Sequence, residues 1–305
     1  MKAIVGYLKN YLYSVNKRLF ICSALFVALA IFVNYYFDLN GWINSLNDGQ
    51  EFLSWYILFQ IAFSFAYLLP ALWGQNKVFQ HREFRLLLLI APVLFAWKMS
   101  FDFNVPITED WVENAYWNRV LYWVFKLLVM ILCLLVVWGI FDRQQPFYGL
   151  RAKGFSLKPY GLMLLSMVPL IAAASTQMDF LSMYPKFHNV TFLSGGRSSG
   201  WYKVLYELSY GIDFVGIELF FRGFLVLAFL KWAGKDAILP MAIFYCTIHF
   251  GKPMGECISS FFGGLILGVV TYHTRSIYGG LLVHLGIAWL MELGGYIGRM
   301  YTGYH

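Results

Sequence analysis

Residues 121–141 read LYWVFKLLVMILCLLVVWGIF, a continuous apolar stretch with one charged side chain, Lys126. A helix that crosses a bilayer needs about 20 mainly apolar residues. Lipid offers no hydrogen-bond partners, so the backbone polar groups must be satisfied within the segment, as they are in a helix. Residues 121–141 therefore predict a transmembrane helix.

Further stretches of the chain meet the same requirement. They lie at 19–37, 52–73, 86–101, 160–177, 205–230, 237–250, 258–273 and 278–297. The stretches 86–101 and 237–250 are short for a full span, and we expect them to be tilted, broken or re-entrant. The predicted fold class is all-α, a polytopic transmembrane helical bundle of about 8–9 helices.

Composition supports a membrane protein. Of the 305 residues, 60% are hydrophobic and 13% are charged, whereas roughly 25% are charged in soluble domains. A soluble fold could not cover so much apolar surface with polar groups. The aromatic content of 20% suits the membrane interfaces, where amphipathic rings lie at headgroup level.

The charge of +7 comes from Lys and Arg residues that stand singly or in pairs between apolar stretches. This pattern favours membrane lipid as a partner and argues against nucleic acid. The cysteines match no metal or disulfide spacing, and we interpret them as small core residues. They are Cys22, Cys133, Cys246 and Cys257.

Loop charge predicts the orientation. With the N-terminus inside, Lys and Arg are more frequent in the inner loops than in the outer ones. The stretch 19–37 is too long for a signal peptide and lacks a small-residue exit, so we expect it to be retained. We expect an integral protein of the bacterial inner (plasma) membrane with a cytoplasmic N-terminus.

An irregular stretch divides the chain. Residues 179–204 contain Pro185 and several glycines. Few ionisable groups lie within the apolar segments before this stretch, and several lie within those after it. The predicted organisation is accessory transmembrane helices at 1–178, a connecting loop at 179–204, and a helical core of catalytic type at 205–305.

Ionisable side chains at membrane depth are costly, and each is a functional candidate. Glu218 and Arg222 stand at i and i+4, where a carboxylate and a guanidinium can pair. His249 ends one apolar stretch, and His284 lies inside another. Taken singly, these residues also fit a structural ion pair and satisfied core histidines, and Glu256 fits an acid at a helix start.

Together these side chains indicate hydrolytic chemistry. A carboxylate beside an imidazole can activate water. The second imidazole can stabilise an oxyanion or help hold a metal. These are the requirements of peptide hydrolysis inside a membrane.

Three short motifs resemble the CAAX protease and bacteriocin-processing family, relatives of the type 2 CAAX prenyl endopeptidase. The family motifs are Glu-Glu-x-x-x-Arg, Phe-x-x-x-His and His-x-x-x-Asn. This chain has IELFFR at 217–222, YCTIH at 245–249 and HLGIA at 284–288. Ile217 replaces the first Glu and Ala288 replaces the Asn. The chain also resembles a subset with a single Glu in the first motif and His-Phe-Gly-Lys-Pro-x-x-Glu as its second, here 249–256.

The resemblance implies an intramembrane endopeptidase that hydrolyses a peptide bond of a membrane-bound or lipid-anchored peptide or protein substrate. Glu218 would orient or activate water with His249, and His284 would stabilise the oxyanion. Arg222 would keep Glu218 ionised. Glu256 is the first candidate for the missing carboxylate.

Several alternatives stay open. Asp213, one turn before Ile217, is a second candidate for the missing carboxylate. The site would work either without a cofactor or with a divalent metal, zinc being a candidate, held by Glu218, His249 and His284. The lost Glu and Asn also allow a catalytically silent scaffold or immunity-type membrane protein. Buried charges allow a transporter, although no inverted repeat is apparent in the sequence.

Overall fold

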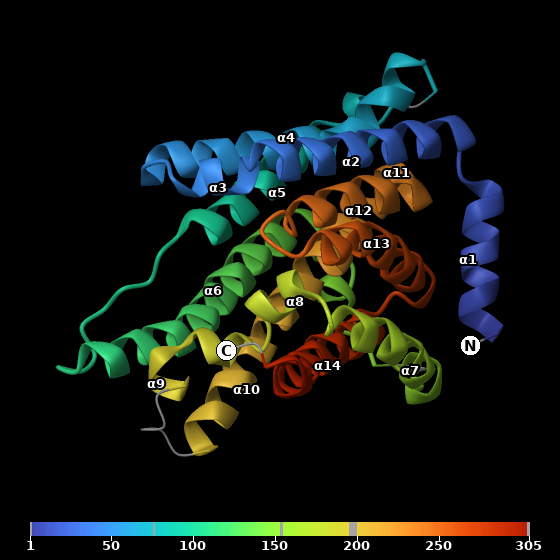
Figure 1. Cartoon of the computed structure of the whole chain (residues 1–305). Helices are drawn as coiled ribbons and strands as arrows, with labels where there is room; N and C mark the ends of the chain where they lie inside the picture. Colours follow the sequence, from blue (N-terminus) through green and yellow to red (C-terminus); the bar gives the residue numbers. More distant parts are fainter. Residues whose placement is uncertain (1, 76, 153–154, 195–199, 304–305) are drawn as a thin grey trace.

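The chain folds into helices joined by loops (Figure 1). This computed structural model describes residues 2–75, 77–152, 155–194 and 200–303, and those residues contain no β-strand. The all-α fold class is confirmed.

All the predicted helices are present, with small shifts at their ends. They are α2 (Lys17–Phe37), α4 (Asp48–Leu72), α5 (Arg82–Ser100), α6 (Trp111–Phe141), α7 (Leu157–Ala174), α10 (Gly200–Glu218), the π-helix η4 (Leu219–Ala228), α12 (Ile238–Thr247), α13 (Met254–Thr274) and α14 (Tyr278–Thr302). The predicted helix at 205–230 is divided between α10 and η4.

Within the described residues, six helices are long and apolar enough to cross a membrane: α2, α4, α6, α7, α13 and α14. They make the chain a polytopic helical membrane protein, as predicted. The N-terminal helix α1 (Lys2–Ser14) was not predicted, and it is too short to span a membrane. Short helices also occur in the connections: α3 (Leu39–Asn44), η1 (Val78–Gln80), η2 (Phe147–Gly149), α8 (Met178–Met183), η3 (Lys186–Asn189), α9 (Thr191–Ser194), α11 (Leu230–Ala233) and η5 (Gly234–Ala237).

The helix α12 lies at the centre of the molecule. Each of its 10 residues is buried, and it packs against α2, α4, α13 and η4. A helix that is apolar on all sides is expected inside a protein or a bilayer. Enclosure by longer helices explains why 237–250 is too short for a simple span.

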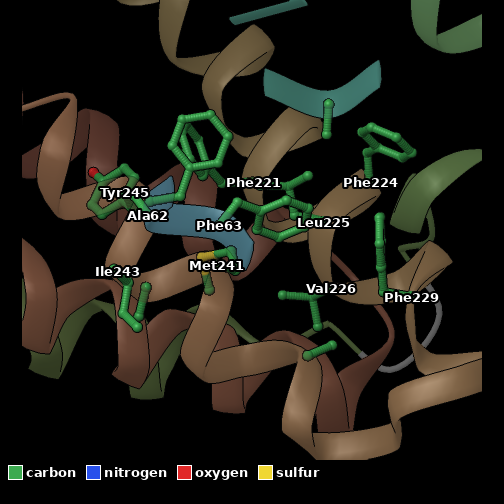
Figure 2. Packing of buried hydrophobic residues seen from close by; sticks show 14 of the residues in the cluster. Ala62, Phe63, Phe221, Phe224, Leu225, Val226, Phe229, Met241, Ile243 and Tyr245 are labelled. Carbon is green, nitrogen blue, oxygen red and sulfur yellow. The ribbon is translucent and has the colours of Figure 1, made fainter. Parts of the chain in front are cut away.

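Aromatic side chains fill the space between η4, α4 and α12 (Figure 2). The Phe63 ring of α4 lies 5.2 Å from the Phe229 ring and 5.8 Å from the Phe244 ring, centroid to centroid. The Phe63–Phe229 pair is edge-to-face, and such a pair contributes about 0.5–1.5 kcal/mol beyond the area that it buries. The packing fixes η4 against α12, and these two elements carry Arg222 and Tyr245, two of the polar residues described below.

Glycines allow the helices to approach closely. A Cβ on Gly268 of α13 would lie 2.6 Å from the Met241 side chain, and one on Gly264 would lie 3.2 Å from the Tyr245 ring. On α14, a Cβ on Gly298 would lie 2.3 Å from the carbonyl oxygen of Ser175. Small residues four positions apart commonly serve this purpose in membrane helices.

A buried ion pair joins the first half of the chain to the second. Lys98 of α5 pairs with Asp213 of α10, and both side chains are mostly buried. The ammonium group of Lys126 in α6 donates hydrogen bonds to the Lys98 carbonyl and to the Tyr122 hydroxyl. Asp213 is thus placed against the accessory helices. The division at 179–204 stays a prediction.

We predict that Asp213→Ala destabilises the protein by about 3–5 kcal/mol, because it leaves a buried ammonium group without its counter-charge. Replacing both partners, as in Lys98→Met with Asp213→Leu, should restore most of the loss. The measurement is the free energy of unfolding in detergent micelles. Glu109→Ala removes an exposed acid and is the control. An Asp213→Ala protein as stable as this control would contradict the prediction.

Candidate functional site

The site begins where α10 becomes a π-helix. Glu218 is the last residue of α10, and Arg222 lies in η4, whose residues are all buried. Both side chains have 0% exposure, and Arg222 Nη1 lies 3.1 Å from Glu218 Oε1. Runs of π-helix are rare and are often found at functional sites. The pairing of Glu218 with Arg222 that the sequence predicted is thus present, as an ion pair shielded from solvent.

Glu218 also contacts α14. The Nδ1 of His284 lies 3.0 Å from the same oxygen, Glu218 Oε1, and the Nε2 of His284 lies 3.0 Å from the Tyr245 hydroxyl. A carboxylate accepts hydrogen bonds, so Nδ1 carries the proton and donates it. Nε2 then accepts from the hydroxyl of Tyr245. Glu218, His284 and Tyr245 form one hydrogen-bonded chain across three elements.

Tyr245 is the residue on which the other groups converge. Its carbonyl oxygen accepts a hydrogen bond from His249 Nδ1 at 2.8 Å, and the His249 ring lies 4.7 Å from its own ring. The Arg222 guanidinium carbon lies 4.1 Å from the centroid of the same ring, a cation–π contact. In the sequence, Tyr245 was noted only as the motif position where the family has Phe. The hydroxyl that Tyr adds to Phe was the signal that could have marked this residue as part of the site.

The side chains of the two histidines are partly exposed, whereas the carboxylate is not. The side chain of His284 is 13% exposed, that of Glu218 is 0% exposed, and His249 is partly exposed. His249 uses its Nδ1 to bind a backbone carbonyl, which leaves Nε2 with a lone pair. The structure brings Glu218, Arg222 and His284 together directly, and His249 joins them through Tyr245.

Glu256 belongs to a separate group at the start of α13. Both of its oxygens accept from the Tyr184 hydroxyl, at 3.0 and 3.1 Å, and one lies 3.6 Å from Lys252 Nζ. Lys252 Nζ in turn donates to the Tyr184 hydroxyl at 3.0 Å. Burial raises the pKa of Tyr184 well above its ordinary value, and the charge of Glu256 adds to this effect. The hydroxyl therefore keeps its proton and donates it to Glu256.

Tyr184 and Lys252 were missed by sequence reasoning. Tyr184 lies in the irregular stretch between the two halves, where nothing in the sequence predicts a contact with α13. Lys252 stands inside the quoted motif at 249–256, and its position there was the available signal. The group formed by Tyr184, Lys252 and Glu256 borders the segment that carries His249.

Gly280 supports the carboxylate of Glu218 from α14. A Cβ at this position would lie 2.4 Å from Glu218 Oε2. Only a glycine leaves room for the carboxylate in its present place. The sequence could not indicate this contact, because it depends on how α10 and α14 cross.

The predicted metal ligands do not form a metal site in this arrangement. Both ring nitrogens of His284 are engaged by protein groups, and so is Nδ1 of His249. Within the part of the chain that the structure describes, no group of three His, Cys, Asp or Glu side chains is placed to hold a metal ion. Glu218, His249 and His284 are arranged instead as a hydrogen-bonded network.

Comparison with known families finds a match in the second half of the chain. Residues 201–290 match the family model described as type II CAAX prenyl endopeptidase Rce1-like. No curated protein and no solved structure matches the chain. The matched segment contains Glu218, Arg222, His249, Glu256 and His284, and it confirms the resemblance expected from the three motifs.

We predict that Gly280→Ala displaces the Glu218 carboxylate and destabilises the protein by about 1–3 kcal/mol through overpacking. In a Glu218→Ala background the same change should cost little, because the clashing atoms are gone. The unfolding free energies of the two single variants and the double variant provide this test. Gly263→Ala is the control, since a Cβ there meets no atom within 4 Å. Equal losses in both backgrounds would show that Glu218 is not the group displaced.

Proposed function

We propose that this chain, whose residues 201–290 match the Rce1-like family model, is an intramembrane endopeptidase acting on a membrane-bound or lipid-anchored substrate. A family of the CAAX protease type sets the reaction class. The observation that carries the proposal is the chain of contacts from Glu218 through His284 to Tyr245, in which the His284 side chain is partly exposed.

In this proposal His284 is the general base. Glu218 accepts a hydrogen bond from His284 Nδ1–H. It thereby stabilises the imidazolium that forms when His284 Nε2 takes a proton from water. An acid behind a histidine plays the same role in serine hydrolases. Arg222 pairs with Glu218 and balances the charge of the carboxylate. Glu218 and Arg222 are positioning residues here, since neither side chain is exposed to a substrate.

Tyr245 and His249 would complete the site. In the structure the Tyr245 hydroxyl donates to His284 Nε2. When a water molecule binds to His284 Nε2 instead, this hydroxyl can turn and donate to the oxygen of the scissile carbonyl. The lone pair on His249 Nε2 can accept the other proton of that water and orient it. The hydroxide attacks the carbonyl carbon, and His284 then returns the proton to the leaving amine. Stabilising the developing oxyanion is commonly the largest contribution in such reactions.

This assignment differs from the one that the sequence suggested. The sequence placed water between Glu218 and His249 and gave the oxyanion to His284. In the structure Glu218 is fully buried and contacts His284. Water activation by the histidine therefore fits the geometry better than direct activation by the carboxylate. Glu256, held by Tyr184 and Lys252, is proposed to bind substrate beside His249 rather than to activate water.

A catalytically silent scaffold is the second candidate, and one observation favours it. Ile217 and Ala288, which replace the family's Glu and Asn, both lie in a hydrophobic cluster with Phe214, Tyr210 and Leu285. The two polar positions have thus become apolar together, as expected if this part of the site had lost its chemistry. In that case Glu218→Gln with His249→Ala would leave the biological function of the chain intact.

We predict that Glu218→Gln and His284→Asn each lower kcat by about 10²–10⁴, with KM nearly unchanged. An effect on kcat alone is expected of groups that act on the proton transfer, whereas a folding defect would lower the amount of active protein. Tyr245→Phe should lower kcat by a smaller factor, on the order of 10–10². The measurement is cleavage of prenylated and unprenylated membrane-anchored peptides by the protein in lipid vesicles, followed by mass spectrometry.

The control is His273→Asn. His273 stacks on Tyr7 of α1 at 4.3 Å and takes no part in the site. Addition of a zinc chelator is a further arm, and we expect it to leave the rate unchanged. Full activity in both Glu218→Gln and His284→Asn would rule out the proposed mechanism.

A further inference from the structure

Two thiols face each other where α12 ends and α13 begins. Cys246 Sγ and Cys257 Sγ are 3.9 Å apart. Cys246 Sγ lies 3.4 Å from the Cys257 carbonyl oxygen, and Cys257 Sγ lies 3.8 Å from the Cys246 carbonyl oxygen. Their residues are 1% and 0% exposed. The mechanism proposed above uses neither thiol.

The packing of the two helices holds these sulfurs together. Gly264 and Gly268 of α13 lie against Ala242, Tyr245 and Met241 of α12, and this brings the two backbones close. Cys246 precedes the last residue of α12, and Cys257 lies in the first turns of α13. The pair therefore sits at the closed end of a helical hairpin whose geometry is fixed by other contacts.

We propose that Cys246 and Cys257 form an oxidation site, at which a peroxide converts the two thiols to a reversible disulfide that closes the loop 248–253. A disulfide brings its sulfurs to about 2.05 Å. The two sulfurs must therefore approach by about 2 Å, a change that side-chain rotation can supply while the hairpin stays folded.

The chemistry balances with a small peroxide as the oxidant. The sulfur of one cysteine attacks a peroxide oxygen, so that an S–O bond forms, the O–O bond breaks and, for hydrogen peroxide, one water leaves with the thiol proton. The second thiol attacks the resulting sulfenic acid. The S–S bond forms, the S–O bond breaks, and a second water carries away the remaining proton. Two thiols are oxidised and one peroxide is reduced.

Burial makes the site selective. A small uncharged peroxide can reach the sulfurs when the loop opens locally, whereas a protein oxidant cannot approach them in the folded state. Asn34 and Tyr35 of α2 hold the loop closed through hydrogen bonds to the carbonyls of Phe250 and Lys252, at 2.9 and 2.6 Å. A sulfenic acid formed on either cysteine therefore has the other thiol beside it and is protected from further oxidation.

The disulfide would tether the loop beside the candidate site. His249 follows Cys246 by three residues, and Glu256 immediately precedes Cys257. Closing a ring through these residues removes conformations from the unfolded chain and so stabilises the folded one. This inference does not rest on the proposed hydrolysis, because a silent scaffold would carry the same pair of thiols.

The test uses the full chain in detergent with Cys22 and Cys133 replaced by serine. Those two cysteines are partly exposed and lie on other helices. The protein is exposed to hydrogen peroxide, its remaining free thiols are alkylated after unfolding, and its peptides are analysed without reduction. We expect one disulfide between Cys246 and Cys257 within a single chain, reversed by dithiothreitol, and a higher midpoint of thermal unfolding in the oxidised protein.

Cys246→Ala in the same background is the matched control, and it should show neither the cross-linked peptide nor the shift in midpoint. If that variant does not fold, Cys257→Ala serves the same purpose. Recovery of both cysteines in alkylated form, oxidation of either one to a sulfinic acid, or a disulfide that joins two chains would overturn the proposal. Each readout is independent of peptide cleavage.

Discussion

The candidate site depends on one buried carboxylate and on the groups that pair with it. Glu218 has 0% exposure and lies among apolar helices, and an isolated charge in such a place would cost many kilocalories per mole. Arg222 supplies the opposite charge, His284 supplies a hydrogen bond, and Gly280 leaves the space that the second oxygen occupies. These contacts come from η4 and α14, so they form only when those elements have come together. The ordering of the bundle and the assembly of the site are the same event.

The first half of the chain makes buried contacts with the segments that carry the candidate site. Lys98 of α5 binds Asp213 of α10, one turn before the first motif. On the other side, Asn34 of α2 holds the loop that carries His249. The first half is therefore part of the framework that positions the second, although the family match is confined to residues 201–290. A membrane helix pair has little hydrophobic drive to associate, and polar contacts of this kind help to specify which faces meet.

Apolar length predicted the helices, and the cost of buried charge predicted the polar residues of the site. Both signals are local properties of the chain and need no knowledge of the packing. The change from α10 to a π-helix at Leu219 was not predictable, because an apolar run has no polar face whose period could reveal a wider turn. The roles of Gly280 and Tyr184 were also hidden. Each depends on an atom from a distant segment, and the sequence contains no record of that proximity.

The role of Glu218 could not be predicted from the sequence. The motif singled out this residue as a candidate, but it could not tell a carboxylate that contacts water from one that acts through a neighbour. The exposure of the Glu218 side chain decides between these two roles, and exposure is a property of the folded chain. Tyr245 likewise lies in a motif, but the motif does not show what its side chain contacts. In the structure its hydroxyl and ring contact His284, Arg222 and His249.

The complete enclosure of α12 restricts how a substrate can arrive. Because helices surround all ten of its residues, no peptide can slide in sideways from the hydrocarbon past that helix. The partly exposed edges of His249 and Lys252 lie beyond its C-terminal end, beside a turn rather than along a helical wall. A polypeptide that reaches these groups would have to approach the turn after α12 and could not cross that helix. A flexible segment could follow the turn, whereas a continuous helix would first have to unwind.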